Sequence, residues 1–230
     1  EEYALKLSQI GIDSILLKRI LSVGVPAGLQ FVTFDLANLL IQSGINSFGS
    51  VSIAAFTAYA KADMLTWMLS GAFGVAITTF VGQNYGAQKY DRIYKSVKIC
   101  LGMGVALIGS CSTIIILFRH FILGIFSADP EVIRLGAWLM LWVVPFNVIF
   151  VPVEIFAGAM RGTGYSAVPT AITSVCVCLF RVLWLFTVVQ RFHTLGMLML
   201  CYPISWILAD IAFLVTYLRG NWLRRQPQTT

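Results

Sequence analysis

Six ionisable residues lie inside long apolar stretches of this sequence, and their chemistry stands out first. They are Asp35, Lys61, Asp63, Glu154, Arg181 and Asp210. A charged side chain at bilayer depth is energetically costly, so such residues either form ion pairs between helices or serve a function. With four acids and two bases, two carboxylates lack a basic partner. A buried carboxylate without a partner can take up and release protons near neutral pH, which is the chemistry of a proton-coupled or cation-coupled carrier.

Asp35 shares one face of its predicted helix with other polar residues. Within an arc of about 80°, at about 100° per residue, the same face also carries Asn38, Gln42 and Asn46. Lipid cannot face this stripe, which therefore lines either a helix-packing seam or a water-filled cavity. We favour the cavity because the stripe continues for about three turns. Pro26 in the same helix removes a backbone hydrogen bond and invites a bend, as suits a helix that moves.

A second polar face surrounds Asp63. Aromatic rings and thioethers near a carboxylate suit flat, lipophilic cations, through cation–π and dispersion contacts. Packing against a neighbouring helix would explain the same pattern equally well. The candidate substrate- or cation-binding residues are Asp35, Asn38, Gln42, Asp63, Met64 and Trp67, and the structural or coupling candidates are Lys61, Arg181, Glu154 and Asp210. We expect Arg181 to be held by Asp63 or Asp35, because an unpaired guanidinium at that depth is costly.

These residues must be positioned by membrane-spanning helices. The chain of 230 residues is 58% hydrophobic and 11% charged, which leaves too little polar surface for a water-soluble globule. Uncharged runs approach or exceed the roughly 20 residues that a spanning helix needs. The predicted fold is an all-α, polytopic membrane protein with six spans at residues 20–46, 52–81, 97–118, 132–159, 166–189 and 196–218. Such a composition excludes a soluble enzyme, a disordered chain, a coiled coil and a secreted disulfide scaffold.

The flanking segments are short and polar. Residues 1–19 form a lead-in, with Asp13 or Ser14 as a plausible N-cap, and residues 219–230 form a tail that we expect to be disordered from Asn221 onward. Glycines at 82 and 86 predict a tight turn after the second span, followed by an amphipathic helix over 87–98 on the membrane surface.

Charge sets the expected orientation. Eleven of the sixteen Lys and Arg residues fall on the side of the N-terminus and three on the other side. Short basic loops stay in the cytoplasm, so both termini are predicted to be cytoplasmic. The net charge of +6 is explained by this topology, and no nucleic-acid partner is predicted.

Neither a metal site nor a catalytic site is predicted. The five cysteines lie in apolar runs, and Cys176 and Cys178 point about 200° apart on a helix. The two histidines, His120 and His193, fall at the outer ends of helices, and no HExxH motif occurs. We therefore expect no enzyme activity and no cofactor beyond a coupling ion, H⁺ or Na⁺.

Several short segments together resemble the C-terminal half of the MATE (multidrug and toxic compound extrusion) transporters. They are VPAGLQ at 25–30, INSFG at 45–49, VGQNYGA at 81–87 and RGTG at 161–164, followed by Pro169 and Arg181. Their motif residues include Pro26, Gln30, Gly82, Gln83, Asn84, Gly86, Arg161, Gly162 and Gly164. The resemblance runs from about residue 15 to residue 218.

The resemblance implies a fold and a function. MATE transporters have twelve helices in two six-helix lobes, and their substrate is thought to occupy a cleft that opens alternately to each side, driven by Na⁺ or H⁺. This sequence would supply helices seven to twelve, and its lack of a starting methionine fits a longer protein. Implied partners are an N-terminal six-helix lobe, small lipophilic and often cationic substrates, and the lipid of a bacterial cytoplasmic membrane. Asp35 occupies the place of an acid that some members carry, whereas Glu154 lies about a turn beyond the family's acid position near Phe150.

Two alternatives remain open. A flippase for lipid-linked sugars would need basic residues in its cleft for pyrophosphate, and only Lys61 and Arg181 are available. An inactive half-transporter fragment is the other alternative. The leading prediction is one lobe of a cation-coupled multidrug efflux antiporter.

Overall fold

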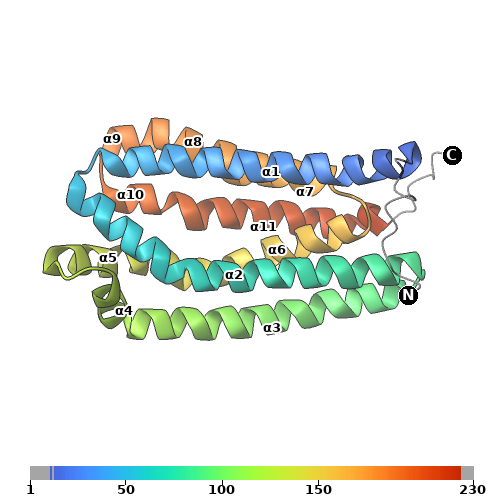
Figure 1. The fold of residues 1–230 in the computed structure, drawn as a ribbon, viewed down its shortest axis with the longest axis horizontal. Coiled ribbons are helices and arrows are strands. Elements are labelled where there is room, and N and C mark those ends of the chain that lie inside the picture. Colours follow the sequence, from blue (N-terminus) through green and yellow to red (C-terminus); the bar gives the residue numbers. More distant parts are fainter. Residues whose placement is uncertain (1–10, 12, 224–230) are drawn as a thin grey trace.

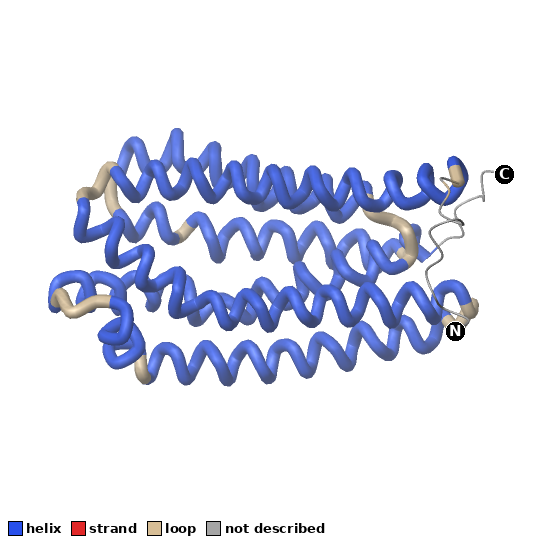
Figure 2. Tube along the Cα trace, viewed as in Figure 1, coloured by secondary structure: helices blue, strands red, loops and turns tan. Residues whose placement is uncertain are grey.

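The computed structural model describes residues 11 and 13–223, and this part of the chain is built from helices without a strand (Figures 1 and 2). Six stretches are long and apolar enough to cross a membrane: Ser14–Asn46, Ser50–Gly86, Tyr90–Leu117, Pro130–Gly162, Ala167–Phe192 and Leu195–Arg219. The predicted all-α membrane fold with six spans is therefore confirmed. Most of the predicted lead-in and the tail beyond Leu223 lie outside the described residues.

Helix α1 (Ser14–Asn46) begins as its sequence predicts. The Asp13 side chain accepts hydrogen bonds from the backbone N–H groups of Ile15 (2.8 Å) and Leu16 (3.2 Å), which otherwise have no partner within the helix. Helix α1 then passes through Pro26 and runs along one side of the bundle, against α7 (Ala167–Ile172) (Figure 1).

A tight turn follows the second span as predicted, but it comes a few residues later than expected, and the predicted surface helix is wrong. Helix α2 (Ser50–Gly86) continues through the predicted turn, and the chain reverses over three residues, with Gln88 at a φ of 58°. Helix α3 (Tyr90–Leu117) then starts at once. The apolar residues of its first turns do not face lipid, because Ile93 and Val97 are completely buried in the bundle. The same amphipathic pattern therefore suits a helix that packs on protein and a helix that lies on a membrane surface.

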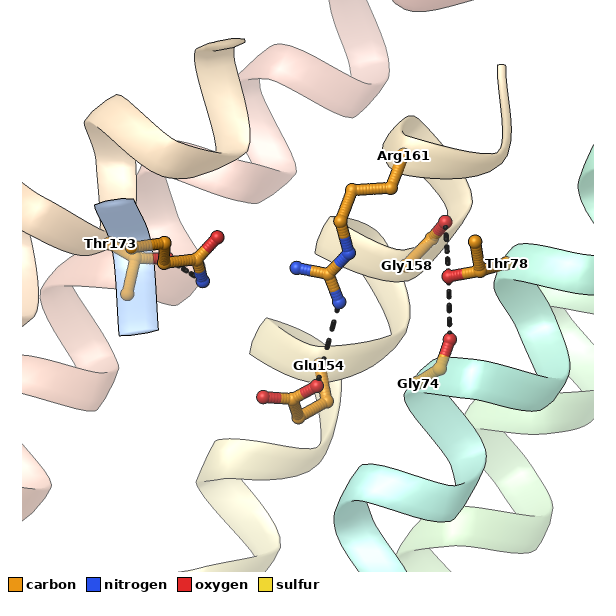
Figure 3. Close-up of polar contacts among 7 residues, drawn as sticks. Gly74, Thr78, Glu154, Gly158, Arg161 and Thr173 are labelled. Carbon is orange, nitrogen blue, oxygen red and sulfur yellow. Dashed lines mark hydrogen bonds and ion pairs between the residues drawn. The ribbon is translucent and has the colours of Figure 1, made fainter. Parts of the chain in front are cut away.

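Helices α2 and α6 (Asn147–Gly162) form a close-packed seam. A Cβ atom added at Gly158 would lie 2.6 Å from the carbonyl oxygen of Gly74, and one at Gly162 would lie 2.6 Å from that of Thr78. The Thr78 hydroxyl donates to the carbonyl oxygens of Gly74 (2.7 Å) and Gly158 (3.0 Å) (Figure 3). Small residues spaced four apart let the two backbones touch, as in other membrane helix pairs.

Three of the six spans are irregular. The fourth joins α5 (Pro130–Val143) to α6 through a 3₁₀ turn at Val144–Phe146, where Pro145 lacks an N–H group. The fifth contains two π-helical segments, Thr173–Leu179 and Leu185–Val189, on either side of α8 (Phe180–Trp184), and ends in α9 (Gln190–Phe192). The sixth consists of α10 (Leu195–Met199) and α11 (Cys201–Arg219). Helix α4 (Arg119–Phe126) lies between the third and fourth spans.

The start of the predicted tail is ordered. Asn221–Leu223 form a 3₁₀ turn, and the Trp222 ring stacks on Tyr217 with centroids 5.2 Å apart. The Thr163 hydroxyl, just after α6, donates to the Trp222 carbonyl oxygen at 3.0 Å. The expectation of disorder from Asn221 is therefore wrong for these three residues, because Trp222 is an apolar anchor within a polar stretch.

Candidate substrate cavity

A cavity of about 500 Å³ lies between α1, α2, α8 and α11. This volume is within the usual range for a pocket that binds a drug-sized molecule. Its wall is mostly apolar and aromatic, with a few charged and amide groups. The lining comprises Phe34, Asn38 and Gln42 of α1, eight residues between Phe56 and Trp67 of α2, Arg181 of α8 and Tyr202 of α11.

Asp63 is the acid of this cavity and is 1% exposed. One of its carboxylate oxygens accepts a hydrogen bond from the Trp67 indole N–H at 3.0 Å, one turn along α2. The other accepts from the Asn147 side-chain amide at 2.7 Å. Asn147 is the first residue of α6, so the break at Pro145 brings this amide to Asp63. Two neutral donors from different elements thus fix the carboxylate in place.

Arg181 is the buried base of the cavity and is likewise 1% exposed. Its Nε–H donates to the Ser205 hydroxyl at 3.0 Å. Aromatic rings surround the guanidinium: the carbon atom Cζ lies 4.3 Å from the Tyr202 ring centroid, 5.5 Å from that of Phe34 and 5.9 Å from that of Trp206. The Nη1 and Nη2 atoms are buried and have no hydrogen-bond partner among the described residues.

The expected ion pair of Arg181 is not formed. In the described part of the chain, the ion pair shorter than 4.0 Å joins Arg161 to Glu154, at 3.8 Å along α6 (Figure 3). Asp63 instead takes neutral donors, and the cation is stabilised by rings and a hydroxyl. The cavity therefore holds opposite charges that are not paired with each other.

Most of the predicted binding residues come together here, with one exception. The cavity is lined by Asn38, Gln42, Lys61, Asp63, Met64, Trp67 and Arg181. Asp35 is exposed and is not among the lining residues, although Asn38, one turn further along α1, is. The role of Asp35 therefore stays a prediction. Gln42 donates from its side chain to that of Asn46 at 3.1 Å, so the polar stripe of α1 is partly bonded along itself.

The other two intramembrane acids lie outside this lining. Glu154 is next to Arg161, and a Cβ atom added at Gly74 would lie 2.6 Å from its carboxylate oxygen. Asp210 of α11 has one buried carboxylate oxygen without a hydrogen-bond partner among the described residues. With Asp63, Lys61 and Arg181 in its wall, the cavity contains more bases than acids, whereas acids outnumber bases among the six ionisable residues of the apolar stretches.

Five residues of the site were not predicted from the sequence. They are Phe34, Asn147, Tyr202, Ser205 and Trp206. Two signals were available. An amide two residues after a proline inside an apolar span indicates a break that exposes a polar group. The spacing of Tyr202, Ser205 and Trp206 places them on one helix face.

Some motif residues of the sequence tie helices together. Gln30 donates from its side chain to the Thr173 hydroxyl at 3.2 Å, and Thr170 donates to the Pro26 carbonyl oxygen at 3.1 Å, which joins α1 to the fifth span. Asn84 donates to the Phe80 carbonyl oxygen at 2.8 Å within α2. These motifs fix the architecture around the cavity rather than its lining.

Comparison with known proteins gives one consistent family. The MatE family model matches residues 26–187. A probable multidrug resistance protein NorM of Thermotoga maritima is 26% identical over 219 residues, which are 92% of this chain and 46% of that protein. A protein of the same name from Chromobacterium violaceum is 30% identical over 152 residues, 66% of this chain and 33% of that protein. The chain spans between a third and about half of the length of such relatives.

Solved structures show the same fold. A MOP superfamily transporter from Pyrococcus furiosus superposes with a TM-score of 0.84 at 18% identity, over 96% of this chain and 50% of that one. An outward-facing multidrug resistance MATE family transporter matches with the same TM-score, identity and coverage. In both, the matched part is half of a longer chain.

Proposed function

We propose, from the premise that this chain belongs to the MatE family, that it forms one six-helix lobe of a multidrug transporter. The cavity between α1, α2, α8 and α11 is then part of the substrate pathway. A second six-helix lobe faces it and closes the pathway. Drug export needs both lobes, because alternating access is the movement of one bundle against the other around a site between them.

The main support for this proposal is that two charged side chains lie on the exposed surface of the lobe at membrane depth. Asp35 and Lys61 are both exposed, and each is about eleven residues from the α1–α2 connection. At about 1.5 Å per residue this is roughly 16 Å into the membrane. Neither side chain can face lipid at that depth without a large cost. A second lobe and a water-filled cleft would cover them, and the half-length matches to solved MATE transporters support this.

Asp35 is proposed as the coupling carboxylate of this lobe, for H⁺ or Na⁺. The residue lies beyond Pro26 on the helix that carries Asn38 and Gln42 into the cavity. A carboxylate beside the cleft would bind the coupling ion in one state and release it as a cationic drug enters, because two positive charges next to one acid in a medium of low dielectric are disfavoured.

Drug transport fits the cavity better than transport of lipid-linked sugars. Lys61 and Arg181 are the two bases that a pyrophosphate would meet, but Asp63 lies in the same wall and would repel it. The apolar and aromatic remainder of the lining favours a compact lipophilic molecule.

The test is ethidium efflux from energised proteoliposomes that contain the natural gene product with residues 1–230. Asp35→Asn keeps the shape and removes the charge, so we expect ion-driven efflux to be abolished while the protein still inserts. Asp210→Asn is the matched control and should be milder, because Asp210 is outside the cavity lining. Normal ion-dependent efflux by Asp35→Asn would reduce Asp35 to a structural residue.

We also propose that the chain lies in a bacterial cytoplasmic membrane with the ends of α2, α6 and α11 toward the cytoplasm. All three end at the same end of the bundle (Figure 1). Single cysteines at Ser50, Ala128 and Gln88 in a cysteine-free background test the orientation. An impermeant reagent applied to intact cells should label the first two positions and not the third, and the opposite pattern would reverse the topology.

A further inference from the structure

We infer that the cavity selects amphoteric substrates, with an anionic group bound at the free edge of Arg181 and a cationic group bound near Asp63. The inference rests on the proposed transport function and adds the substrate class. Its basis is a pair of opposite buried charges that share one cavity without bonding to each other.

The planar guanidinium of Arg181 has N–H groups on Nη1 and Nη2 that make no hydrogen bond to any described residue. A guanidinium carries five N–H groups in one plane, and within the described part of the chain only the Nε–H of Arg181 has a hydrogen-bond partner, the Ser205 hydroxyl. The Tyr202 ring at 4.3 Å stabilises the positive charge but accepts none of the four N–H groups on Nη1 and Nη2. Buried donors without acceptors cost free energy, and a carboxylate that accepts two parallel bonds from the guanidinium would relieve that cost.

Among the residues that the structure describes, no acid is in position for this role. Asp63 is already held by Trp67 and Asn147, one donor to each carboxylate oxygen, and does not come within 4.0 Å of the guanidinium. Among the described residues Glu154 is paired with Arg161 instead. An anionic group from a ligand is therefore the missing acceptor for Arg181.

The other end of the cavity suits a cation. Asp63 accepts hydrogen bonds from two neutral donors, and Trp67 and Met64 of the same helix also line the space. A ligand cation would meet a carboxylate, an aromatic face and a thioether. A ligand with positive charge alone can use the Asp63 end but leaves the N–H groups of Arg181 without an acceptor, so it should bind more weakly than a ligand with both charges. A ligand with both charges satisfies both ends.

The fold holds Arg181 firmly for such a role. Helix α8 lies between two π-helical segments, a distortion that occurs often at functional sites. The Trp184 indole N–H, on the same short helix, donates to the Met197 carbonyl oxygen at 2.8 Å and ties α8 to α10. The guanidinium is therefore fixed by α8, α10 and α11 before any ligand arrives.

The experiment compares an amphoteric ligand with its charge-blocked form on the natural gene product that contains residues 1–230. Norfloxacin carries a carboxylate and an amine, and its ethyl ester keeps only the amine. Binding is followed by quenching of tryptophan fluorescence in nanodiscs. We expect the wild-type protein to bind norfloxacin at least tenfold more tightly than the ester, and Arg181→Met to lose this preference. Arg181→Lys should restore part of it, and Arg191→Met, a change at an exposed arginine outside the cavity, should leave it intact.

The possible failures are distinct. Equal affinity of the wild-type protein for acid and ester overturns the inference without any variant, and so does a preference for the acid that survives in Arg181→Met. If ethidium is still exported in either case, the proposed transport function stands. If neither ethidium nor norfloxacin binds or is transported, the transport function fails and the inference fails with it.

Discussion

Two sides of this six-helix lobe are built in opposite ways. Along the α2–α6 seam, glycines and Thr78 bring two backbones together so closely that a single Cβ atom would clash. On the α1 side, a cavity of about 500 Å³ holds charged residues that are not paired with each other. In the most apolar part of α1 6% of the residues are buried, against 56% in the fourth span. The difference indicates a close-packed, rigid frame beside a loosely packed face that contains the cavity.

The largest expected effect is on the seam. Gly158→Ala places a methyl group 2.6 Å from a backbone carbonyl oxygen and 2.6 Å from an Ile77 methyl group, and the backbone cannot yield as a flexible side chain would. We expect a loss of about 3 kcal/mol in unfolding free energy, the upper end of the usual cost of overpacking. Thermal unfolding in detergent measures it. Gly102→Ala, where nothing lies within 4 Å, is the control and should leave stability unchanged or slightly raised. Equal melting of both variants would mean that the seam is not close-packed.

A smaller effect is expected where the rigid frame meets the cavity. Asn147→Ala removes the amide that donates to Asp63 at 2.7 Å and leaves a buried carboxylate oxygen without that donor. We expect a loss of about 2 kcal/mol, as is typical of a buried hydrogen bond to a charged group. Asn46→Ala changes an exposed amide and should cost no more than about 0.5 kcal/mol. If the two variants melt alike, Asp63 does not depend on the break at Pro145.

The smallest effect is expected on the α1 side. Gln30→Leu removes a part-buried, neutral hydrogen bond to Thr173, and should lower stability by about 1 kcal/mol or less. Because α1 has few other buried contacts, hydrogen exchange should rise along α1 and not along α2 or α6. Gln190→Leu, an exposed position on α9, is the control. Faster exchange spread evenly over all helices would contradict the division into a rigid frame and a loose face.

The sequence predicted the elements better than their contacts. Six spans, the Asp13 cap and seven of the candidate residues around the cavity follow from hydropathy, periodicity and the cost of charge in lipid. The surroundings of Arg181 did not follow, because Phe34 and Ser205 reach it from helices far apart in the chain. The free-energy cost of burying a charge predicts that a buried cation has a partner, but it does not predict whether that partner is an acid, an aromatic ring or a ligand.

Local pattern also failed where two environments produce the same pattern. The amphipathic residues Ile93 and Val97 fit a membrane surface and a protein seam equally well, and only the packing of α3 decides between them. The role of Trp222 could not be predicted, because a single aromatic residue in a polar tail has no periodic pattern. The stacking of its ring on Tyr217 and the hydrogen bond from the Thr163 hydroxyl to its carbonyl oxygen are tertiary contacts, which local sequence does not predict.

If substrate occupies the cavity between α1, α2, α8 and α11, it should protect a cysteine in the cavity wall from labelling. Ala60 is exposed and lines the cavity, whereas Ala54 is exposed on α2 outside it. Each is replaced by cysteine in a background without the five native cysteines, within the natural gene product. We expect saturating ethidium to slow labelling of Ala60→Cys at least fivefold and to leave Ala54→Cys unchanged. Equal labelling rates of Ala60→Cys with and without ethidium, in protein that still exports ethidium, would show that the substrate does not occupy this cavity.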